Sequence, residues 1–420
     1  MSTHKTAIDR LDPAIRKHRT ASATVTLSHD GRTIANQDVV VAQKKHRFLF
    51  GTNWSNNSIA LANGELSGRE KEQAETHNAQ YLQLFNMATL PFYWARFEPE
   101  RGHPQTQRIL NIARWYQDHD CVIKGHPLCW HTLTADWLLD MTNQEILQAQ
   151  LARIQRDVAD FAGVIDMWDV INEAVIMPIF DRYDNGITRL CKDMGRIELI
   201  RAVFDAARAT NPRATLLLND FDISPAHDIL VEGCLEAGIQ IDVIGIQSHM
   251  HQGYWGVEKT LSVLEHFERF NLPIHFTENT ILSGQLMSPE IVDLNDYQVS
   301  EWPSTPEGED RQAQEVISHY KTLVSHPAVE AITWWDLNDG SWLNAPAGLL
   351  RQDESPKPAY DELMKLIKGE WWLSPTHMTT DANGRLSFTG FLGDYELSLD
   401  NQKIAFALED TGAVEIDVAL

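Results

Sequence analysis

Eight short apolar segments recur along the chain and constrain its fold more than any other feature. They lie near residues 47–52, 84–90, 121–126, 165–171, 214–219, 241–246, 273–277 and 330–334. Each has the length and composition of a strand buried on both faces, and segments with helical periodicity fill the gaps between them. Strands that alternate with helices over about 320 residues predict an α/β protein, a (β/α)8 TIM barrel, with a doubly wound open sheet as the alternative.

The segment between the third and fourth predicted strands has a clear helical pattern. Its apolar residues are spaced by four, three, four and three: Leu147, Leu151, Ile154, Val158 and Phe161. Such a stripe is typical of a helix that packs one face against a core. Thr142 and Glu145, just before the stripe, have the spacing of a capping box, so we expect the helix to begin after Thr142.

The two ends of the chain have a different pattern. Residues 21–46 and 371–420 read as short strands with turn signals between them. Neither segment alone is long enough for a robust core, so we predict that both pack together as one small β-sandwich. Trp371 and Trp372 raise the alternative of a carbohydrate-binding module, but their place at the domain junction favours packing there. The predicted domains are an N-terminal arm with strands (1–47), the barrel (48–368) and C-terminal strands (369–420).

The charge of the chain excludes some classes of partner. Its 35 basic and 59 acidic residues give a formal net charge of −24. Such a surface repels nucleic acid and anionic membranes, and no run approaches the roughly 18 apolar residues of a membrane-spanning helix. We therefore expect neither partner, whereas a neutral carbohydrate is compatible with this charge.

The cysteines and the first residues bear on location. The four cysteines show neither metal-binding spacing nor a disulfide framework: Cys121, Cys129, Cys191 and Cys234. Free thiols in a reducing compartment are the simplest account. The first residues contain no apolar stretch typical of a signal peptide. If the chain begins at its natural N-terminus, we expect a cytoplasmic protein.

Two of the predicted strands end in a glutamate. The fourth strand ends in Asn172 and Glu173, and the seventh ends in Glu278. A single glutamate at a strand end is more often a solvated residue, because burying a carboxylate costs several kcal/mol unless it is paired. Two glutamates at the strand ends of one barrel are harder to explain as solvated residues. Glycoside cleavage requires two facing carboxyl groups, and the pair predicts that chemistry.

Other predicted strands also end in polar or aromatic residues. After the third strand come His126, Trp130 and His131; after the fifth, Asn219; after the sixth, Gln247 and His249; after the eighth, Trp334, Trp335 and Trp342. Polar residues at the carboxyl ends of barrel strands indicate catalysis. Indole faces stack on sugar rings, although a buried core position is the default for any single tryptophan.

With these motifs the chain resembles glycoside hydrolase family 10, the endo-β-1,4-xylanase family, over roughly residues 48–368. The matching motifs are GHPLCWH at 125–131, WDVINEA at 168–174, QSH at 247–249, TE at 277–278 and PKPAY at 356–360. The resemblance implies a retaining β-glycosidase in which Glu173 is the acid/base and Glu278 the nucleophile. It implies no cofactor or metal.

The resemblance also implies the residues that bind the sugar next to the cleaved bond. These are His126, Trp130, Asn172, Gln247 and His249, the strand-eight tryptophans Trp334, Trp335 and Trp342, together with Asn219 and Tyr93. In a retaining enzyme the two carboxyl groups lie close enough that both cannot comfortably be ionised. We expect Glu278 to stay ionised through hydrogen bonds from Asn172, Gln247 or His249, and Glu173 to keep its proton at neutral pH.

The chain departs from the family pattern in three places. At the end of the second strand, where the family has Glu-Asn and then Lys-Trp for the distal sugar, it has TLPFYW at 89–94. After Glu278 it has Asn279 and Thr280, where the family has an aspartate that orients the strand-six histidine. The stretch from 281 to about 307 is long and is expected to form a lid. These departures favour imported oligosaccharides or a glycoconjugate over xylan.

Two other functions stay open from the sequence. One is a catalytically silent sugar-binding protein on a xylanase-like barrel, motivated by the altered residues at the second strand. The other is a metal-dependent barrel hydrolase, motivated by 17 histidines and by His126 and His131, although their spacing matches no metal site well. The sugar, the linkage, the endo or exo mode and the oligomeric state do not follow from the sequence.

Overall fold

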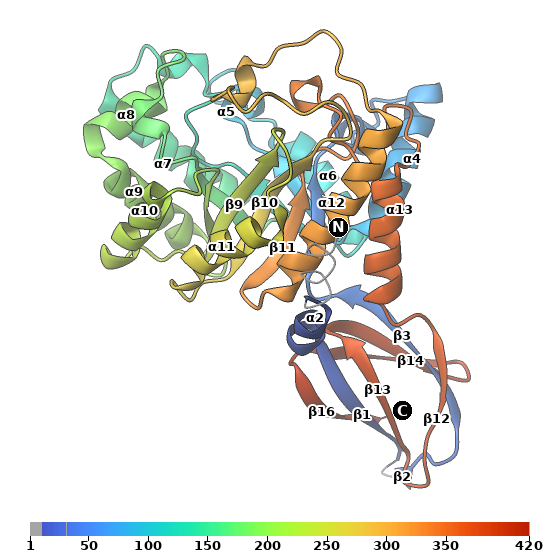
Figure 1. Ribbon diagram of the computed structural model, residues 1–420. Helices are drawn as coiled ribbons and strands as arrows, with labels where there is room; N and C mark the ends of the chain where they lie inside the picture. The colour runs from blue at the N-terminus through green and yellow to red at the C-terminus, as the bar shows by residue number, and fades with distance from the viewer. Residues whose placement is uncertain (1–10, 31, 420) are drawn as a thin grey trace.

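The computed structural model describes residues 11–30 and 32–419, so residues 1–10 of the predicted N-terminal arm lie outside it. Eight parallel strands close into a barrel whose neighbours follow chain order (Figure 1). They are β4 (Leu49–Asn53), β5 (Met87–Pro91), β6 (Val122–His126), β7 (Met167–Asn172), β8 (Thr215–Asp220), β9 (Val243–Met250), β10 (Ile274–Ile281) and β11 (Val329–Trp334). The predicted (β/α)8 barrel is confirmed, and the open sheet is wrong.

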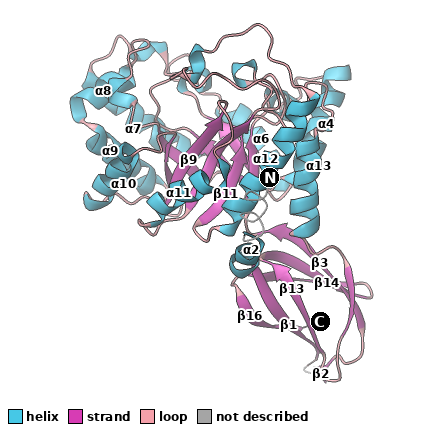
Figure 2. Ribbon diagram, in the orientation of Figure 1, coloured by secondary structure: helices cyan, strands magenta, loops and turns pink. Residues whose placement is uncertain are grey.

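Helices surround these strands in Figure 2. They are α3 (Asn56–Ala62), α4 (Gly68–Leu84), α5 (Trp94–Phe97), α6 (Thr106–Asp118), α7 (Asn143–Asp160), α8 (Gly186–Met194), α9 (Arg196–Thr210), α10 (Pro225–Glu236), α11 (Gly256–Glu268), α12 (Pro306–Ser325) and α13 (Pro358–Lys365), which continues into η5 (Leu366–Glu370). Single turns form η1 (Asp136–Leu138), η2 (Met177–Ile179), η3 (Leu294–Asp296) and η4 (Trp342–Asn344). None of the helices in residues 11–30 and 32–419 has the length and apolar character needed to cross a bilayer.

Helix α7 begins as predicted, and its buried face includes part of the predicted stripe, since Ile154, Val158 and Phe161 are buried. The Thr142 side chain accepts from the backbone of Glu145, whose own side chain accepts from the Thr142 backbone, so the capping box is present. Leu147 and Leu151, expected in the buried stripe, are only half-buried, whereas Gln150 and Arg153 are buried. The reason is that both polar side chains donate to the carbonyl of Leu128 in the loop after β6, at 2.9 and 2.7 Å.

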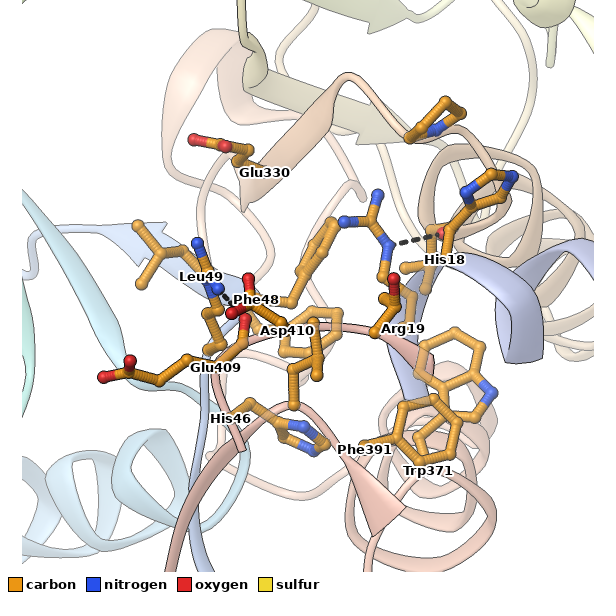
Figure 3. Close-up of a pocket in the computed structure, with 16 residues that line it drawn as sticks. His18, Arg19, His46, Phe48, Leu49, Glu330, Trp371, Phe391, Glu409 and Asp410 are labelled. Carbon is orange, nitrogen blue, oxygen red and sulfur yellow. Dashed lines mark hydrogen bonds between the residues drawn. The ribbon is translucent and has the colours of Figure 1, made fainter. Parts of the chain in front are cut away.

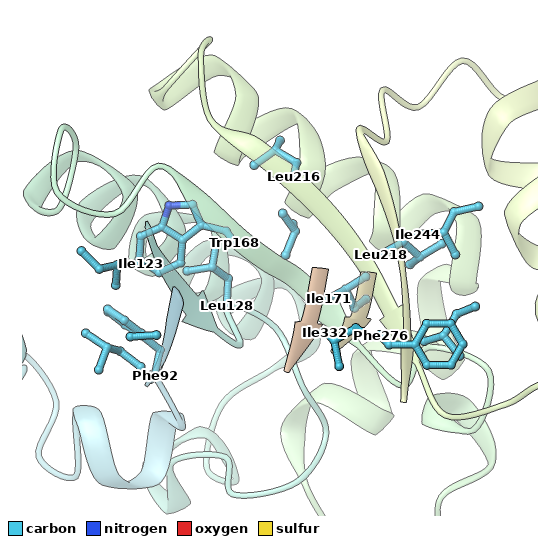
Figure 4. Packing of buried hydrophobic residues seen from close by; sticks show 14 of the residues in the cluster. Phe92, Ile123, Leu128, Trp168, Ile171, Leu216, Leu218, Ile244, Phe276 and Ile332 are labelled. Atoms are coloured by element: carbon cyan, nitrogen blue, oxygen red, sulfur yellow. The ribbon is translucent and has the colours of Figure 1, made fainter. Parts of the chain in front are cut away.

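The inside of the barrel changes from apolar to polar along its axis. At the amino ends of the strands an apolar cluster fills the interior, with Met87, Met167, Leu217, Val243 and Ala331. Two residues further along β6 and β7 the buried Lys124 and Asp169 form an ion pair at 2.8 Å. Because side chains alternate along a strand, the outward residues build the layer between strands and helices, where Trp168, Phe92 and Ile123 pack together (Figure 4). Polar groups are thus concentrated toward the carboxyl ends of the strands.

The strands near both chain ends form the small β-sandwich expected from the sequence, drawn below the barrel in Figure 1. One sheet has the order β13 (Arg385–Phe391), β1 (Thr20–His29) and β16 (Gly412–Ala419), with β2 (Arg32–Thr33) beside β1. The other has the order β12 (Thr376–Thr379), β3 (Asp38–His46), β14 (Gly393–Leu399) and β15 (Gln402–Leu408). Between them lies a core that includes Val25, Leu27, Val41 and Leu397. The helix α2 (Leu11–Arg19) precedes β1.

The sandwich meets the barrel at the amino ends of the barrel strands. Trp371 is buried there with its ring 6.1 Å from that of Phe50, so it packs at the junction. Arg19 donates to the carbonyls of Val324 and Val329 at 2.9 and 2.6 Å, which ties the start of β1 to the barrel. A cavity of about 360 Å³ lies between the two units (Figure 3). This end is opposite to the carboxyl ends of the strands, where the polar residues gather.

Candidate active site

Most of the predicted site residues come together at the carboxyl ends of the barrel strands. One group is joined by hydrogen bonds or close contacts: His126, Trp130, Asn172, Glu173, Asn219, Gln247, His249 and Glu278. Tyr93, Trp335 and Trp342 place their rings against the histidines of this group, with centroids 5.6, 5.5 and 4.5 Å away. The ends of seven of the eight barrel strands, β5 to β11, supply these residues.

Glu173 is aimed into this group by an irregular strand end. The pairing of β7 with β8 shifts register between Asp169 and Ile171, so Asn172 rather than Ile171 faces inward. Glu173 follows in the left-handed region at φ 57°, which is unusual for a residue with a side chain. Its carboxyl group accepts from the indole of Trp130 at 2.8 Å and from the amides of Asn172 and Gln247 at 3.1 and 3.2 Å.

Glu278 is held by a second irregular strand. The register of β10 against β9 shifts between Phe276 and Glu278, so two successive side chains, Thr277 and Glu278, can both contact Asn219. Glu278 is buried, with 5% exposed, and accepts from Nε2 of His249 at 3.1 Å and from the amide of Asn219 at 3.2 Å. Glu278 thus has a hydrogen-bond donor on each carboxylate oxygen.

Three amides connect the two glutamates. The carbonyl oxygen of Asn172 accepts from Asn219 at 2.7 Å and from Gln247 at 3.2 Å. Asn219 also donates to Glu278, and Gln247 also donates to Glu173, both at 3.2 Å. The carboxyl groups therefore share one network, in which each amide is oriented by its neighbours.

The protonation of Glu173 follows from its surroundings. Burial raises the pKa of Glu173, the negative charge of Glu278 raises it further, and together they bring it to about 8 despite the hydrogen bond from Trp130. Both effects act in the same direction because each disfavours a second negative charge in the site. Glu173 is therefore protonated at neutral pH. The site holds a proton donor, Glu173, on the same network as Glu278, which accepts hydrogen bonds from His249 and Asn219.

Lys124 and Asp169 support His126 from below the site, and they are absent from the site residues predicted from the sequence. Nδ1 of His126 donates to Asp169 at 2.8 Å, and Nε2 lies 3.8 Å from Glu278. Burial raises the pKa of Asp169, but Lys124 and His126 outweigh it and leave the pKa below its usual value. The buried pair fixes the ring of His126. Lys124 directly precedes the motif at 125–131 and Asp169 lies within the motif at 168–174, and their charge inside an apolar strand was the available signal.

The support for His249 is rebuilt by Thr280. The Thr280 hydroxyl lies 3.4 Å from Nδ1 of His249 and equally far from Nδ1 of His251. Asn279 contributes elsewhere, since its amide donates to the carbonyls of Phe276 and Thr333 at 2.9 and 2.7 Å. A hydroxyl therefore stands where the family pattern has a carboxylate.

An aromatic wall replaces the polar residues that the family has after the second strand. The ring of Tyr93 lies 5.3 Å from that of Trp54 and 5.5 Å from that of Trp130, and Trp54 lies 6.0 Å from Trp335. Burial, and then the charges of Glu278 and other carboxyl groups, raise the pKa of the Tyr93 hydroxyl, which stays neutral. The wall presents ring faces and edges instead of charges.

Asn53 and Asp336 also belong to this rim, and the sequence list had left them out. The amide of Asn53 donates to Asp336 at 2.8 Å, and the backbone N–H of Trp342 donates to the other carboxylate oxygen at 2.8 Å. These bonds join the ends of β4 and β11 and position the loop that carries Trp342. Asn53 is the last residue of β4 and Asp336 lies two residues after β11, so both could have been found by listing polar residues at the strand ends.

Trp334 lies away from the group. It is fully buried, its indole donates to the carbonyl of Ala347 at 3.0 Å, and its ring faces Tyr320 of α12 at 6.5 Å. Because side chains alternate along β11, Trp334 packs between barrel and helices, whereas Trp335 reaches the site. The expected sugar contact of Trp334 does not fit this position.

The described residues also bear on metal and thiol chemistry. Throughout residues 11–30 and 32–419, His, Cys, Asp and Glu side chains form no group of three or more that could hold a metal ion. All four cysteines are buried and free.

Comparison with known proteins identifies the family of the chain. A family model described as glycosyl hydrolase family 10 matches residues 45–366. Endo-1,4-beta-xylanase A of Xylanibacter ruminicola is 26% identical over 306 residues, which cover 64% of this chain and 80% of the relative. Endo-1,4-beta-xylanase B of Thermotoga neapolitana is 26% identical over 299 residues, covering 66% and 78%.

Solved structures share the fold. The family 10 protein from Paenibacillus barcinonensis, 22% identical, matches with a TM-score of 0.63 over 77% of this chain and 96% of that one. Native xylanase 10B from Thermotoga maritima, 24% identical, matches with a TM-score of 0.61 and the same coverage. With a family match over most of its length, the chain belongs to glycosyl hydrolase family 10 and is a xylanase-like glycosidase.

Proposed function

We propose that this protein is a retaining β-glycoside hydrolase that works by double displacement, with Glu278 as the nucleophile and Glu173 as the acid/base. One observation carries the proposal. Glu173, with a pKa of about 8, and Glu278, held by His249 and Asn219, lie on one hydrogen-bond network. A retaining mechanism needs these two states, one carboxyl group protonated and the other ionised.

In the first step a carboxylate oxygen of Glu278 attacks the anomeric carbon. Glu173 gives its proton to the glycosidic oxygen, the bond to the leaving group breaks, and a glycosyl ester forms on Glu278. The negative charge of Glu278 is then gone, which removes one of the two causes of the raised pKa of Glu173. Glu173, now ionised, takes a proton from water as that water attacks the anomeric carbon and releases Glu278.

The surrounding residues suit a sugar in the site. We expect Asn172 to bond the sugar 2-hydroxyl, a contact that strengthens in the transition state. His126 is oriented by Asp169 to donate to a hydroxyl, and Trp335 offers an indole beside both histidines, 5.5 and 6.2 Å from their centroids. The substrates we propose are oligosaccharides or glycoconjugates, because the wall of Trp54 and Tyr93 replaces charged contacts to a distal sugar with aromatic ones.

The test measures hydrolysis of aryl β-xylobioside and aryl β-cellobioside by the wild type and by Glu278→Ala. We expect at least one substrate to be cleaved and the variant to lose this activity by a factor of about 10³ or more, since the nucleophile is absent. Proton NMR of the first product formed should show the β-anomer. Undiminished activity of Glu278→Ala, or an α-anomer as the first product, would end the proposal.

Glu173→Ala gives an independent check. With a good aryl leaving group the first step needs little acid catalysis, so the glycosyl ester accumulates and its hydrolysis limits the rate. Azide needs no general base and should restore turnover while forming the β-glycosyl azide. A Glu173→Ala variant with wild-type kinetics would remove Glu173 from the mechanism.

A further inference from the structure

Two loops meet above the carboxyl ends of β8 and β9. One follows β7 and contains Arg182; the other, residues 282–305, follows β10 and contains Asp293 and Asp296. Arg182 forms ion pairs with both aspartates, one through each terminal nitrogen. In the barrel order β8 and β9 lie between β7 and β10, so this contact must cross the ends of both strands. In Figure 1 the gold loop after β10 runs over the top of the barrel.

Hydrogen bonds hold the first half of the loop after β10 against the barrel. The side chain of Gln252, just after β9, donates to the carbonyls of Ser288 and Ile291 at 2.9 and 2.7 Å. The backbone N–H of Met287 donates to the carbonyl of His251 at 2.9 Å. Met287 and Trp302 are buried in an apolar cluster of this loop. At its tip Leu294 of η3 packs against this cluster, and Asp293 and Asp296 pair with Arg182. We call residues 282–305, closed by Arg182, the arch.

The arch stands on the side from which the leaving group departs. Glu173 ends β7, at the foot of the loop that carries Arg182, and it is the group that protonates the glycosidic oxygen in the proposed mechanism. Tyr183, next to Arg182, has its pKa raised by burial and also by the charge of Glu173, which places it in the field of that carboxyl group. Phe180 packs between His131 and Tyr183, with centroids 4.5 and 5.0 Å away.

Apolar side chains are exposed around the same space. Tyr183 is 46% exposed and Phe221, directly after β8, is 43% exposed. The carboxylate of Asp220 accepts from the backbone N–H of Val175 at 3.0 Å, so the loops after β7 and β8 are joined next to Glu173. Large aromatic side chains left open to water beside a reacting group fit an apolar partner that covers them when the substrate binds.

We propose that Arg182 is a specificity-determining residue: by closing the arch over the ends of β8 and β9 it confines the leaving group to a short, aromatic or otherwise apolar aglycone and excludes a long sugar chain. The inference rests on the proposed function. A polymer-cleaving site needs a groove that is open at both ends, whereas a tie between the loops of β7 and β10 closes the leaving-group end.

The test compares kcat/KM for two substrates of the same sugar. One is the 4-nitrophenyl β-bioside that the wild type cleaves, and the other is the matching hexasaccharide, β-1,4-xylohexaose or cellohexaose. Arg182→Ala breaks both ion pairs and should raise the hexasaccharide-to-aryl ratio about fivefold, the scale expected from losing two partly exposed pairs. Arg201→Ala is the matched control, because Arg201 is similarly exposed and pairs with Glu198 on α9, away from the site.

Two further measurements test whether the ion pairs of Arg182 themselves set the ratio, rather than a general loosening of the loops. The charge-swapped variant Arg182→Asp with Asp293→Arg and Asp296→Arg should restore the wild-type ratio, since it rebuilds the tie with opposite polarity. Raising the salt to about 1 M should raise the ratio in the wild type and leave Arg182→Ala unchanged, because exposed ion pairs are screened.

The outcomes distinguish the two proposals. A wild type that cleaves neither substrate refutes the proposed function, and the inference fails with it. Two results would refute the inference about the arch and leave the proposed function standing. One is a wild type that cleaves the hexasaccharide as efficiently as the aryl glycoside. The other is a hexasaccharide-to-aryl ratio that Arg182→Ala changes no more than Arg201→Ala does. Loss of all activity in Arg182→Ala would also contradict it, because Arg182 contacts no residue of the catalytic network.

Discussion

Replacing Glu278 by glutamine should lower the pKa of Glu173. The variant removes the negative charge of Glu278 but keeps its shape and a carbonyl that can accept from Asn219. In the variant, burial still raises the pKa of Glu173 and is the larger of the two causes. The repulsion from the charge of Glu278 is absent. The pKa should therefore fall from about 8 without reaching the value of a carboxyl group in water.

The size of the fall follows from Coulomb's law. Two unit charges about 5.5 Å apart, the separation typical of retaining glycosidases, interact by about 3 kcal/mol at an effective dielectric constant of about 20. One pKa unit corresponds to about 1.4 kcal/mol, so the upper limit is a fall of about 2. Water in the open site screens part of this interaction, and we expect a fall of about 1 to 2.

Carbon-13 NMR of protein labelled at the glutamate carboxyl carbons measures this pKa, with Glu173→Gln identifying the resonance. Wild-type enzyme trapped as a 2-fluoroglycosyl ester should show a similar fall, since the ester also removes the charge. The pH profile of wild-type kcat/KM gives a kinetic counterpart: activity should decline as pH rises through about 8, where Glu173 loses its proton. A pKa of Glu173 that is the same within 0.3 in Glu278→Gln and wild type would show that burial alone raises it, and would refute the coupling.

Three further substitutions test the scaffold of the site. Lys124→Met should destabilise the fold by about 3 kcal/mol in urea unfolding, because it leaves the buried charge of Asp169 without its cation. Gly125→Ala should cost about 2 kcal/mol or more by the same assay, since a Cβ there would lie 2.2 Å from the ring of Trp168. Thr280→Val should lower kcat about tenfold with little change in stability, because the strand-six imidazole loses the hydroxyl beside its Nδ1.

Each substitution has a matched control. Lys71→Met removes an exposed pair with Glu75 and should change stability by less than about 0.5 kcal/mol. Gly369→Ala adds a Cβ with nothing closer than 4.0 Å and should be nearly neutral. Thr322→Val alters a buried threonine of α12 and should leave kcat unchanged. Equal effects in a variant and its control would contradict the reason given for that variant.

The barrel could be predicted because its strands are buried on both faces. Continuous apolar segments result, and eight of them at regular intervals leave few architectures. The capping box of α7 could also be predicted from the sequence, since it depends on two residues three positions apart. The buried face of α7 was predicted only in part, because Gln150 and Arg153 are buried by their hydrogen bonds to the carbonyl of Leu128 after β6, and sequence periodicity counts only apolar residues.

The site was predictable in its residue types and less so in its geometry. Strand ends gave both glutamates and the residues around them, yet the register shifts that aim Asn172 and Glu278 inward have no signature in the sequence. Alternation of side chains along β11 predicts that Trp334 and Trp335 face opposite sides of the barrel wall. The sequence does not show which of the two faces the interior. The contact of the Thr280 hydroxyl with His249 depends on the pairing of β10 with β9, which the sequence does not specify.

The pairing of Thr20 with Phe391 has a consequence for how this molecule is made. A ribosome releases β1 long before β13 and β16 exist, so for most of synthesis its backbone N–H and C=O groups have no sheet to join. Such an unpaired strand is a template for association with other chains. The nascent protein therefore carries an unpaired strand while the entire barrel is synthesised. We expect chaperones to bind the first strands during its biogenesis.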